Sequence, residues 1–139
     1  MTDVVRLVDT SVWHRARHPA VLEQWATMLG ADLLAVCGPV RLEILYSARS
    51  PSDYGSLRAE LDGLRQIDTG ADAVRRAEEV QALLARGALH HRSVKLIDLL
   101  VAATAELASV TVWHYDEDYD RISAVTGQPT VWVARRGSL

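Results

Sequence analysis

Four acidic residues, far apart in the chain, have the side chains and settings that suit a metal site: Asp9, Glu43, Asp98 and Asp116. Asp98 is the most informative, because it is the only charged residue between Leu96 and Ala105 in an otherwise apolar segment. A buried carboxylate without a partner is costly or becomes protonated, and a bound cation relieves that cost. Carboxylates that converge without histidine or cysteine form a hard-oxygen site, which suits Mg²⁺ or Mn²⁺.

The hydrophobic pattern predicts strands and helices that alternate along the chain. Short β-branched or apolar runs predict strands at 4–8, 32–37, 110–114 and 130–134. Apolar residues at helical spacing predict helices at 18–29, 39–49, 50–65, 71–86, 96–107 and 117–125. This alternation predicts an α/β fold with a parallel sheet that helices cover on both faces.

The expected topology brings the four acids to one edge of that sheet. In a right-handed βαβ unit, the end of a strand and the start of the next helix lie on the same edge. Asp9 directly follows the first predicted strand, and Glu43 lies in the second turn of the helix after the second. Asp98 opens the apolar helix, and Asp116 follows the strand at 110–114. Open α/β sheets bind their ligands at this edge.

Each acid also has an interpretation that needs no metal. Asp9 begins an Asp-Thr-Ser sequence, which is a good N-cap for a short helix. The acidic run at 116–120 is also typical of a polar turn that starts a helix. Glu43 and Asp98 have basic neighbours for ion pairs, namely Arg41, Arg49 and Lys95. The shared edge favours a common site, because four independent accidents would otherwise have to coincide.

The length, net charge and cysteine count exclude several classes of protein. The chain has 139 residues, 49% of them apolar, with 18 acidic against 15 basic residues and a formal net charge of −3. This balance excludes a strongly basic nucleic-acid clamp or membrane-binding patch as the dominant feature. A single cysteine, Cys37, excludes an internal disulfide framework and fits a reducing compartment. We expect one domain over 1–139, without a membrane-spanning segment, in the cytoplasm.

The motifs resemble those of the PIN-domain ribonucleases, and most closely the VapC-type toxins of bacterial toxin–antitoxin pairs. The resemblance covers almost the whole chain and is carried by four segments, VRLVDTSVW, VRLEILYSAR, VKLIDLLVAATA and VTVWHYDEDYDRI. Tyr119 stands where the family usually has phenylalanine, a departure that we expect to be harmless. The pair His90 and His91 matches no motif of the family.

The resemblance implies a fold and a site. The fold is a PIN-like three-layer α/β/α sandwich with a small, mainly parallel sheet. Asp9 and Asp98 would bind Mg²⁺ directly, and Glu43 and Asp116 would act directly or through water. Thr10 or Ser11 would orient Asp9 or a bound water. Asp118 would support the quartet of acids, Asp9, Glu43, Asp98 and Asp116, from outside it.

The resemblance also implies an activity and partners. The activity is endonucleolytic hydrolysis of RNA by metal-activated water, and the partner is a VapB-type antitoxin that covers the acidic pocket. A homodimer is expected too, and the helices over 39–65 carry an apolar surplus that could form it: Leu42, Leu45, Tyr46, Tyr54, Leu57 and Leu61. The alternatives are a PIN nuclease of RNA processing without an antitoxin, or a non-catalytic module that binds through its acidic pocket.

Basic residues outside the site are the candidates for RNA contacts. With the four clustered acids set aside, 14 acids face 15 bases, of which all but one are arginine. Arginine binds phosphate through two parallel hydrogen bonds. Lys95 lies one turn before Asp98, where it could compete with the metal or contact phosphate. The candidates for weak RNA contacts are Arg15, Arg17, Arg49, Arg92 and Lys95.

Overall fold

The computed structural model describes residues 4–139, with five strands and seven α-helices in the described part. The strands are β1 (Arg6–Val8), β2 (Leu34–Cys37), β3 (Arg65–Ile67), β4 (Thr111–His114) and β5 (Thr130–Trp132). The helices are α1 (Thr10–Trp13), α2 (Pro19–Gly30), α3 (Gly38–Tyr46), α4 (Pro51–Asp62), α5 (Ala71–Arg86), α6 (Leu96–Ala108) and α7 (Asp118–Thr126), with a 3₁₀ turn, η1, at His90–Ser93.

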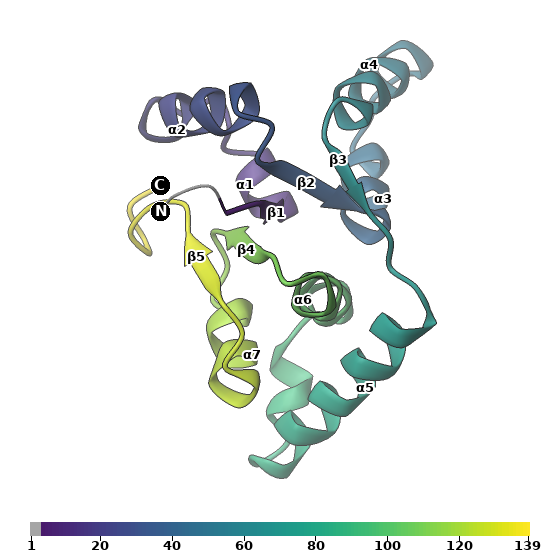
Figure 1. The fold of residues 1–139 in the computed structure, drawn as a ribbon, viewed down its shortest axis with the longest axis vertical. Coiled ribbons are helices and arrows are strands. Elements are labelled where there is room, and N and C mark those ends of the chain that lie inside the picture. The colour runs from purple at the N-terminus through teal and green to yellow at the C-terminus, as the bar shows by residue number, and fades with distance from the viewer. Residues whose placement is uncertain (1–3) are drawn as a thin grey trace.

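The sheet has the order β3-β2-β1-β4-β5, and every strand pair in it is parallel. The chain first moves outward from β1 to β3 and then crosses back to β4 on the other side of β1. Right-handed crossovers in opposite directions place their helices on opposite faces, and Figure 1 shows α2 across the sheet from α5, α6 and α7. The predicted three-layer α/β/α sandwich is therefore confirmed.

The reversal of strand order lies between β1 and β4, where Val8 pairs with Trp113. A crevice opens at the carboxyl ends of the strands at such a point, because the following helices diverge to opposite faces. The chain leaves β1 into α1 at Asp9 and leaves β4 toward α7 at Asp116. The fold thus delivers two of the four predicted acids to the same edge of the sheet, beside the point of reversal.

The core explains why the central elements have so few polar residues. All residues of β2 and β4 are buried, and α6 packs against α5, α7 and β4. A helix enclosed in this way must be apolar around its circumference. Seven residues of α6 are buried: Asp98, Leu99, Val101, Ala102, Ala103, Thr104 and Ala105. Asp98 is the only charged member of this set.

The structure corrects several sequence predictions, and the helix predicted over 50–65 ends at Asp62 because Arg65 belongs to β3. The first strand begins at Arg6, not residue 4, and β3 and η1 were not predicted, whereas α1 is the short helix of the capping interpretation of Asp9. Leu45 and Leu61 belong to the hydrophobic core, so these two residues of the proposed dimer surface are unavailable to a partner. Among the other members, Leu42, Tyr46 and Tyr54 are exposed. Within residues 4–139, no helix has the length and apolar character required to cross a membrane.

Candidate active site

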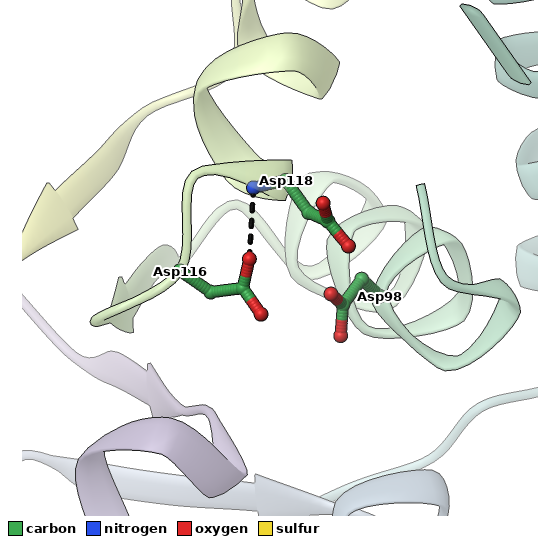
Figure 2. Close-up of side chains that lie close together, drawn as sticks. All are labelled: Asp98, Asp116 and Asp118. Atoms are coloured by element: carbon green, nitrogen blue, oxygen red, sulfur yellow. Dashed lines mark hydrogen bonds between the residues drawn. The ribbon is translucent and has the colours of Figure 1, made fainter. Parts of the chain in front are cut away.

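Three carboxylates meet at this edge of the sheet, and they come from α6, from the β4–α7 connection and from the start of α7. One oxygen from each of Asp98, Asp116 and Asp118 lies within 4.8 Å of the other two. Figure 2 shows the three side chains facing a common space in front of the first turn of α6. We call this group the aspartate cluster. Two of its members belong to the predicted quartet, and Asp118 was expected only to support it.

Asp98 is buried in the first turn of α6. Its side chain is 4% exposed, and Oδ2 accepts no hydrogen bond from the described residues. Oδ1 lies 3.2 Å from the hydroxyl of Tyr119. Desolvation raises the pKa of Asp98 to about 8, and the nearby Asp118 and Asp9 add to this effect. A bound cation would stabilise the ionised form of Asp98, whose Oδ2 has no hydrogen-bond donor.

Asp116 and Asp118 are linked through the backbone that starts α7. The Asp118 N–H donates to Asp116 Oδ1 at 2.9 Å, the bond drawn in Figure 2. The Asp116 N–H donates to Nδ1 of buried His114 at 3.1 Å, and this bond fixes the turn after β4. Asp116 Oδ2 is left to face the cluster. Burial lowers the pKa of His114, so the imidazole stays neutral and keeps Nδ1 as an acceptor.

Two basic residues hold Asp118 from opposite sides. Its Oδ2 accepts from the backbone N–H of Lys95 at 3.0 Å, and Oδ1 accepts from Arg121 at 3.0 Å. Burial alone would raise the pKa of Asp118, but the interactions with Asp98 and Lys95 outweigh it and lower the pKa. Asp118 therefore loses its proton at a lower pH than Asp98, although the two are neighbours.

Lys95 places its ammonium inside the aspartate cluster. Nζ lies 2.7 Å from Asp116 Oδ2, 3.0 Å from Asp118 Oδ2 and 3.4 Å from Asp98 Oδ2. Desolvation would lower the pKa of Lys95, but its bonds to Asp116 and Asp118 outweigh this and raise the pKa. The ammonium thus neutralises part of the negative charge that the fold concentrates here.

Asp9 uses its two oxygens for different purposes. Oδ2 accepts from the Ser11 backbone N–H and from Ser11 Oγ, at 3.1 and 2.5 Å, and thereby caps α1. Oδ1 accepts a 2.6 Å bond from the hydroxyl of Tyr119, which also contacts Asp98. The capping interpretation of Asp9 is therefore true of one oxygen, and the other is directed toward the cluster.

Glu43 lies beside this arrangement and is not part of the aspartate cluster. It is half-buried on α3, and its Oε1 accepts from Thr10 Oγ1 at 2.7 Å. The alternative interpretation, an ion pair of Glu43 with Arg41 or Arg49, is not seen among the described residues, and Arg41 instead binds Asp62 at 2.8 Å. Thr10 thus contacts Glu43, and Ser11 contacts Asp9, which places one supporting hydroxyl beside each of these acids.

Tyr119 is the site residue that the sequence analysis undervalued. Its ring is fully buried, and its hydroxyl lies between Asp9 Oδ1 and Asp98 Oδ1. The expectation that a tyrosine in place of phenylalanine would be harmless overlooked this bridge. Burial and the two carboxylates raise the pKa of Tyr119 well above its usual value, so the phenol keeps its proton and remains a donor. The available signal was the position of Tyr119 between Asp118 and Asp120, in the acidic run that begins α7.

The basic residues predicted to contact RNA are spread over different surfaces. Arg15 donates to the Ser11 carbonyl at 2.8 Å and packs over the Tyr115 ring, so it lies close to the acids. The side chains of Arg17, Arg49 and Arg92 are exposed in the segments α1–α2, α3–α4 and η1. Lys95 differs from all of them because its ammonium is bound inside the cluster.

The donor set fits a hard divalent cation. The converging ligands are carboxylate oxygens, one of them is buried without a hydrogen bond, and no sulfur ligand points toward them in the described part of the chain. Mg²⁺ and Mn²⁺ prefer such oxygen ligands. The geometry therefore provides a place for a cation at the carboxyl edge of a parallel sheet, between the strands where the order reverses.

The chain belongs to the PIN-domain family, whose model matches residues 6–125. Within the family it is 56% identical over 137 residues to ribonuclease VapC18 of Mycobacterium tuberculosis, which covers 98% of this chain and 100% of that protein. Ribonuclease VapC21 of the same species is 42% identical over 134 residues, covering 95% of this chain and 96% of that protein. The chain is thus a member of the VapC group of PIN-domain proteins.

Solved structures share the fold at low sequence identity. DNA-bound VapBC from Salmonella typhimurium contains a chain with a TM-score of 0.76 and 15% identity, covering 94% of this chain and 99% of that chain. VapBC2 from Rickettsia felis, bound to a promoter DNA fragment, gives a TM-score of 0.74 and 18% identity, covering 92% and 98%. At these identities, the likeness establishes the fold alone.

Proposed function

We propose that this chain, as one PIN domain over 1–139, is a Mg²⁺-dependent endoribonuclease that acts as the toxin of a toxin–antitoxin pair. The observation that carries the proposal is the aspartate cluster at the strand-order reversal, with Asp9 joined to it through Tyr119. The ribonuclease names of relatives up to 56% identical support the choice of RNA as substrate. RNA cleavage and a single cysteine both fit the cytoplasm.

Asp9, Asp98 and Asp116 would hold the metal, with Asp118 kept in place by its bonds to Lys95 and Arg121. The bound ion would neutralise charge on the scissile phosphate and lower the pKa of a water molecule, so that the water can attack near neutral pH. Mn²⁺ would bind the same oxygen ligands. The protein's own contribution is to fix these carboxylates on rigid elements before substrate arrives.

Glu43 is suited to orient the attacking water or to accept its proton. The Thr10 bond fixes one oxygen of the Glu43 carboxylate, and the side chain is half-buried rather than enclosed. A carboxylate in this position can act as a general base without binding the metal itself. Attack in line with the leaving oxygen would give a 5′-phosphate and a 3′-hydroxyl.

The RNA strand would be held by basic residues beside the acids and on the surrounding surfaces. Arg15 is the best placed, because it bonds to the Ser11 carbonyl, two residues from Asp9. Arg17, Arg49 and Arg92 are exposed and free to meet phosphates farther along the strand. The substrate sequence would depend on these peripheral contacts rather than on the acidic centre.

The proposed partners are a VapB-type antitoxin and a second copy of the chain. The solved neighbours include several VapBC complexes, and an acidic crevice attracts a basic segment of a partner for electrostatic reasons. The exposed Leu42, Tyr46 and Tyr54 on α3 and α4 are the candidates for a homodimer contact. Co-purification with the product of a small adjacent gene would test the antitoxin.

One experiment tests the proposed activity directly. Purified wild type and Asp98→Asn are incubated with total RNA, with and without Mg²⁺, and new 5′ ends are mapped. We expect discrete cuts that require both Mg²⁺ and Asp98. Equal cutting by both proteins would remove Asp98 from the mechanism, and no metal-dependent cutting of any RNA would favour a non-catalytic binding module.

A further inference from the structure

The ammonium of Lys95 occupies the centre of the oxygen atoms proposed to bind the metal. Its distances to Asp116, Asp118 and Asp98 are 2.7, 3.0 and 3.4 Å, and each contact is made to Oδ2 of the aspartate. For Asp98 Oδ2, buried and without a hydrogen bond from the described residues, this ammonium is the neighbouring positive charge. No second cation of the described chain reaches all three aspartates.

We propose that Lys95 is a tethered counter-cation of the metal site, a positioning residue that sets the site's affinity for metal. In the metal-free protein its ammonium holds the aspartate cluster together, and a divalent ion displaces it on binding. This inference rests on the proposed function, because it assumes that the cluster binds a divalent cation.

A divalent ion must displace the Lys95 ammonium for reasons of both charge and space. A divalent ion would approach carboxylate oxygens to about 2.1 Å, where the ammonium now contacts them. The two cations cannot share the same oxygens, because their repulsion is strong in a partly buried setting. The aspartates, in turn, cannot stay close together without some cation among them.

The local structure allows the side chain to move while the backbone stays. The backbone N–H of Lys95 donates to Asp118 Oδ2 at 3.0 Å, and its carbonyl accepts from the Asp98 N–H at the start of α6. The side chain itself is 62% exposed. Rotation about its flexible stem can therefore withdraw the ammonium into solvent without disturbing α6.

Arg121 provides a matched control. It also binds Asp118, but it contacts Oδ1 at 3.0 Å from the side of α7, and its second ion pair is with Glu117. Among the described residues, Arg121 forms no ion pair with Asp98 or Asp116. Removing Arg121 takes away one positive charge and one bond to Asp118, and it leaves the contacts of Lys95 with all three aspartates in place.

The first test measures Mn²⁺ and Mg²⁺ affinity by calorimetry for wild type, Lys95→Met and Arg121→Met. We expect Lys95→Met to bind the ion about tenfold more tightly than wild type, because no ammonium has to be displaced. Arg121→Met should change the affinity by less than about threefold. Unchanged or weaker binding by Lys95→Met would overturn the proposal.

The second test uses the wild-type chain and does not depend on the variant folding. Lys95 is the only lysine in the sequence, so a ¹⁵N-resolved ammonium signal needs no assignment experiment. On titration with diamagnetic Mg²⁺, this signal should shift or broaden with the same midpoint as the calorimetric binding. Binding of Mg²⁺ with an unperturbed Lys95 signal refutes the displacement and leaves the proposed nuclease intact. Absence of any ion binding refutes both.

Discussion

The acidic site has two halves that hold their negative charge in different ways. On the α6–α7 side, Asp98, Asp116 and Asp118 crowd around the single ammonium of Lys95. On the α1–α3 side, Asp9 and Glu43 are held by the hydroxyls of Ser11 and Thr10. The hydroxyl of Tyr119 joins the two halves through Asp9 and Asp98.

The two halves therefore do different things: in the α6–α7 half a cation offsets the negative charge, and in the α1–α3 half hydroxyl donors orient the carboxylates. Hydroxyl donors fix a carboxylate but leave its charge in place, whereas a cation offsets the charge and can be exchanged for another cation. The α6–α7 half is therefore the part whose electrostatics should respond to a metal. The α1–α3 half should keep its geometry with or without a metal, and its role should be to position the attacking water.

The largest expected effect is on RNA cleavage, which should fall further when the α6–α7 half is changed than when the α1–α3 half is changed. Asp98→Asn should reduce RNA cleavage by about 10³-fold or more, because it removes charge from the centre of the metal site. Glu43→Gln should cost about 10²-fold, as expected for loss of a general base that does not bind the metal. Initial rates at saturating Mg²⁺ measure both. If both variants lost the same cleavage rate and the same metal affinity, Glu43 would be a metal ligand and the two halves would not be distinct.

The second effect concerns stability and pH in the metal-free protein. The pKa of Asp98 rises from 3.8 to about 8 on folding, so ionisation of this carboxyl opposes folding. The penalty is absent below pH 4 and grows as the pH rises toward 8. Asp98→Asn should therefore unfold at a higher temperature than wild type at pH 8, by about 5 °C or more, with the difference vanishing near pH 4.

Saturating Mg²⁺ is the control for that measurement. Because a ligand stabilises only the protein that binds it, Mg²⁺ should raise the unfolding temperature of wild type and leave Asp98→Asn nearly unchanged. A difference between the two proteins that is independent of pH would argue against a penalty from ionisation of Asp98.

The third effect tests the link between the halves. Tyr119→Phe keeps the buried ring but removes the donor to Asp9 Oδ1, and we expect metal affinity to fall about tenfold. The lost bond should also lower the free energy of unfolding by about 1–3 kcal/mol. Tyr115→Phe is the matched control, because its hydroxyl bonds to the backbone of Leu139, away from the aspartates. Similar effects of both substitutions would mean that Tyr119 acts only through packing.

The smallest effect lies within the α1–α3 half. Thr10→Val removes the 2.7 Å bond to Glu43 with little change of shape, so it should lower kcat by about threefold to tenfold. Metal affinity should be unchanged, since Thr10 does not contact the aspartate cluster. A change in calorimetric metal binding would place Glu43 closer to the metal than the structure suggests.

The sequence predicted the main elements because their hydrophobic patterns are strong. Helix α5 has the predicted bounds of 71–86, and α6 begins at the predicted residue, Leu96. Strand β3 was missed because Arg65 and Gln66 are exposed at the edge of the sheet, which leaves no apolar alternation to detect. The buried side chains of Leu45 and Leu61 were assigned to a dimer surface because periodicity alone does not say what covers a helix.

The site was predictable to the level of elements but not of individual contacts. Asp98 stood out as a lone charge in an apolar helix, and strand ends located Asp9 and Asp116. The inclusion of Asp118 and the bridging role of Tyr119 depend on how α7 packs against α6. The contact of Tyr119 with Asp98 joins residues 21 positions apart and its bond to Asp9 spans 110 positions, so no local pattern encodes them.

Anomalous diffraction from a crystal soaked in Mn²⁺ tests the central claim most directly. We predict a single strong peak or a close pair of peaks within about 2.1 Å of oxygens of Asp98 and Asp116, with the Lys95 ammonium turned away from the cluster. A crystal at saturating Mn²⁺ with no peak at these aspartates, and with Lys95 still bound among them, would contradict the proposal of a metal-dependent nuclease site.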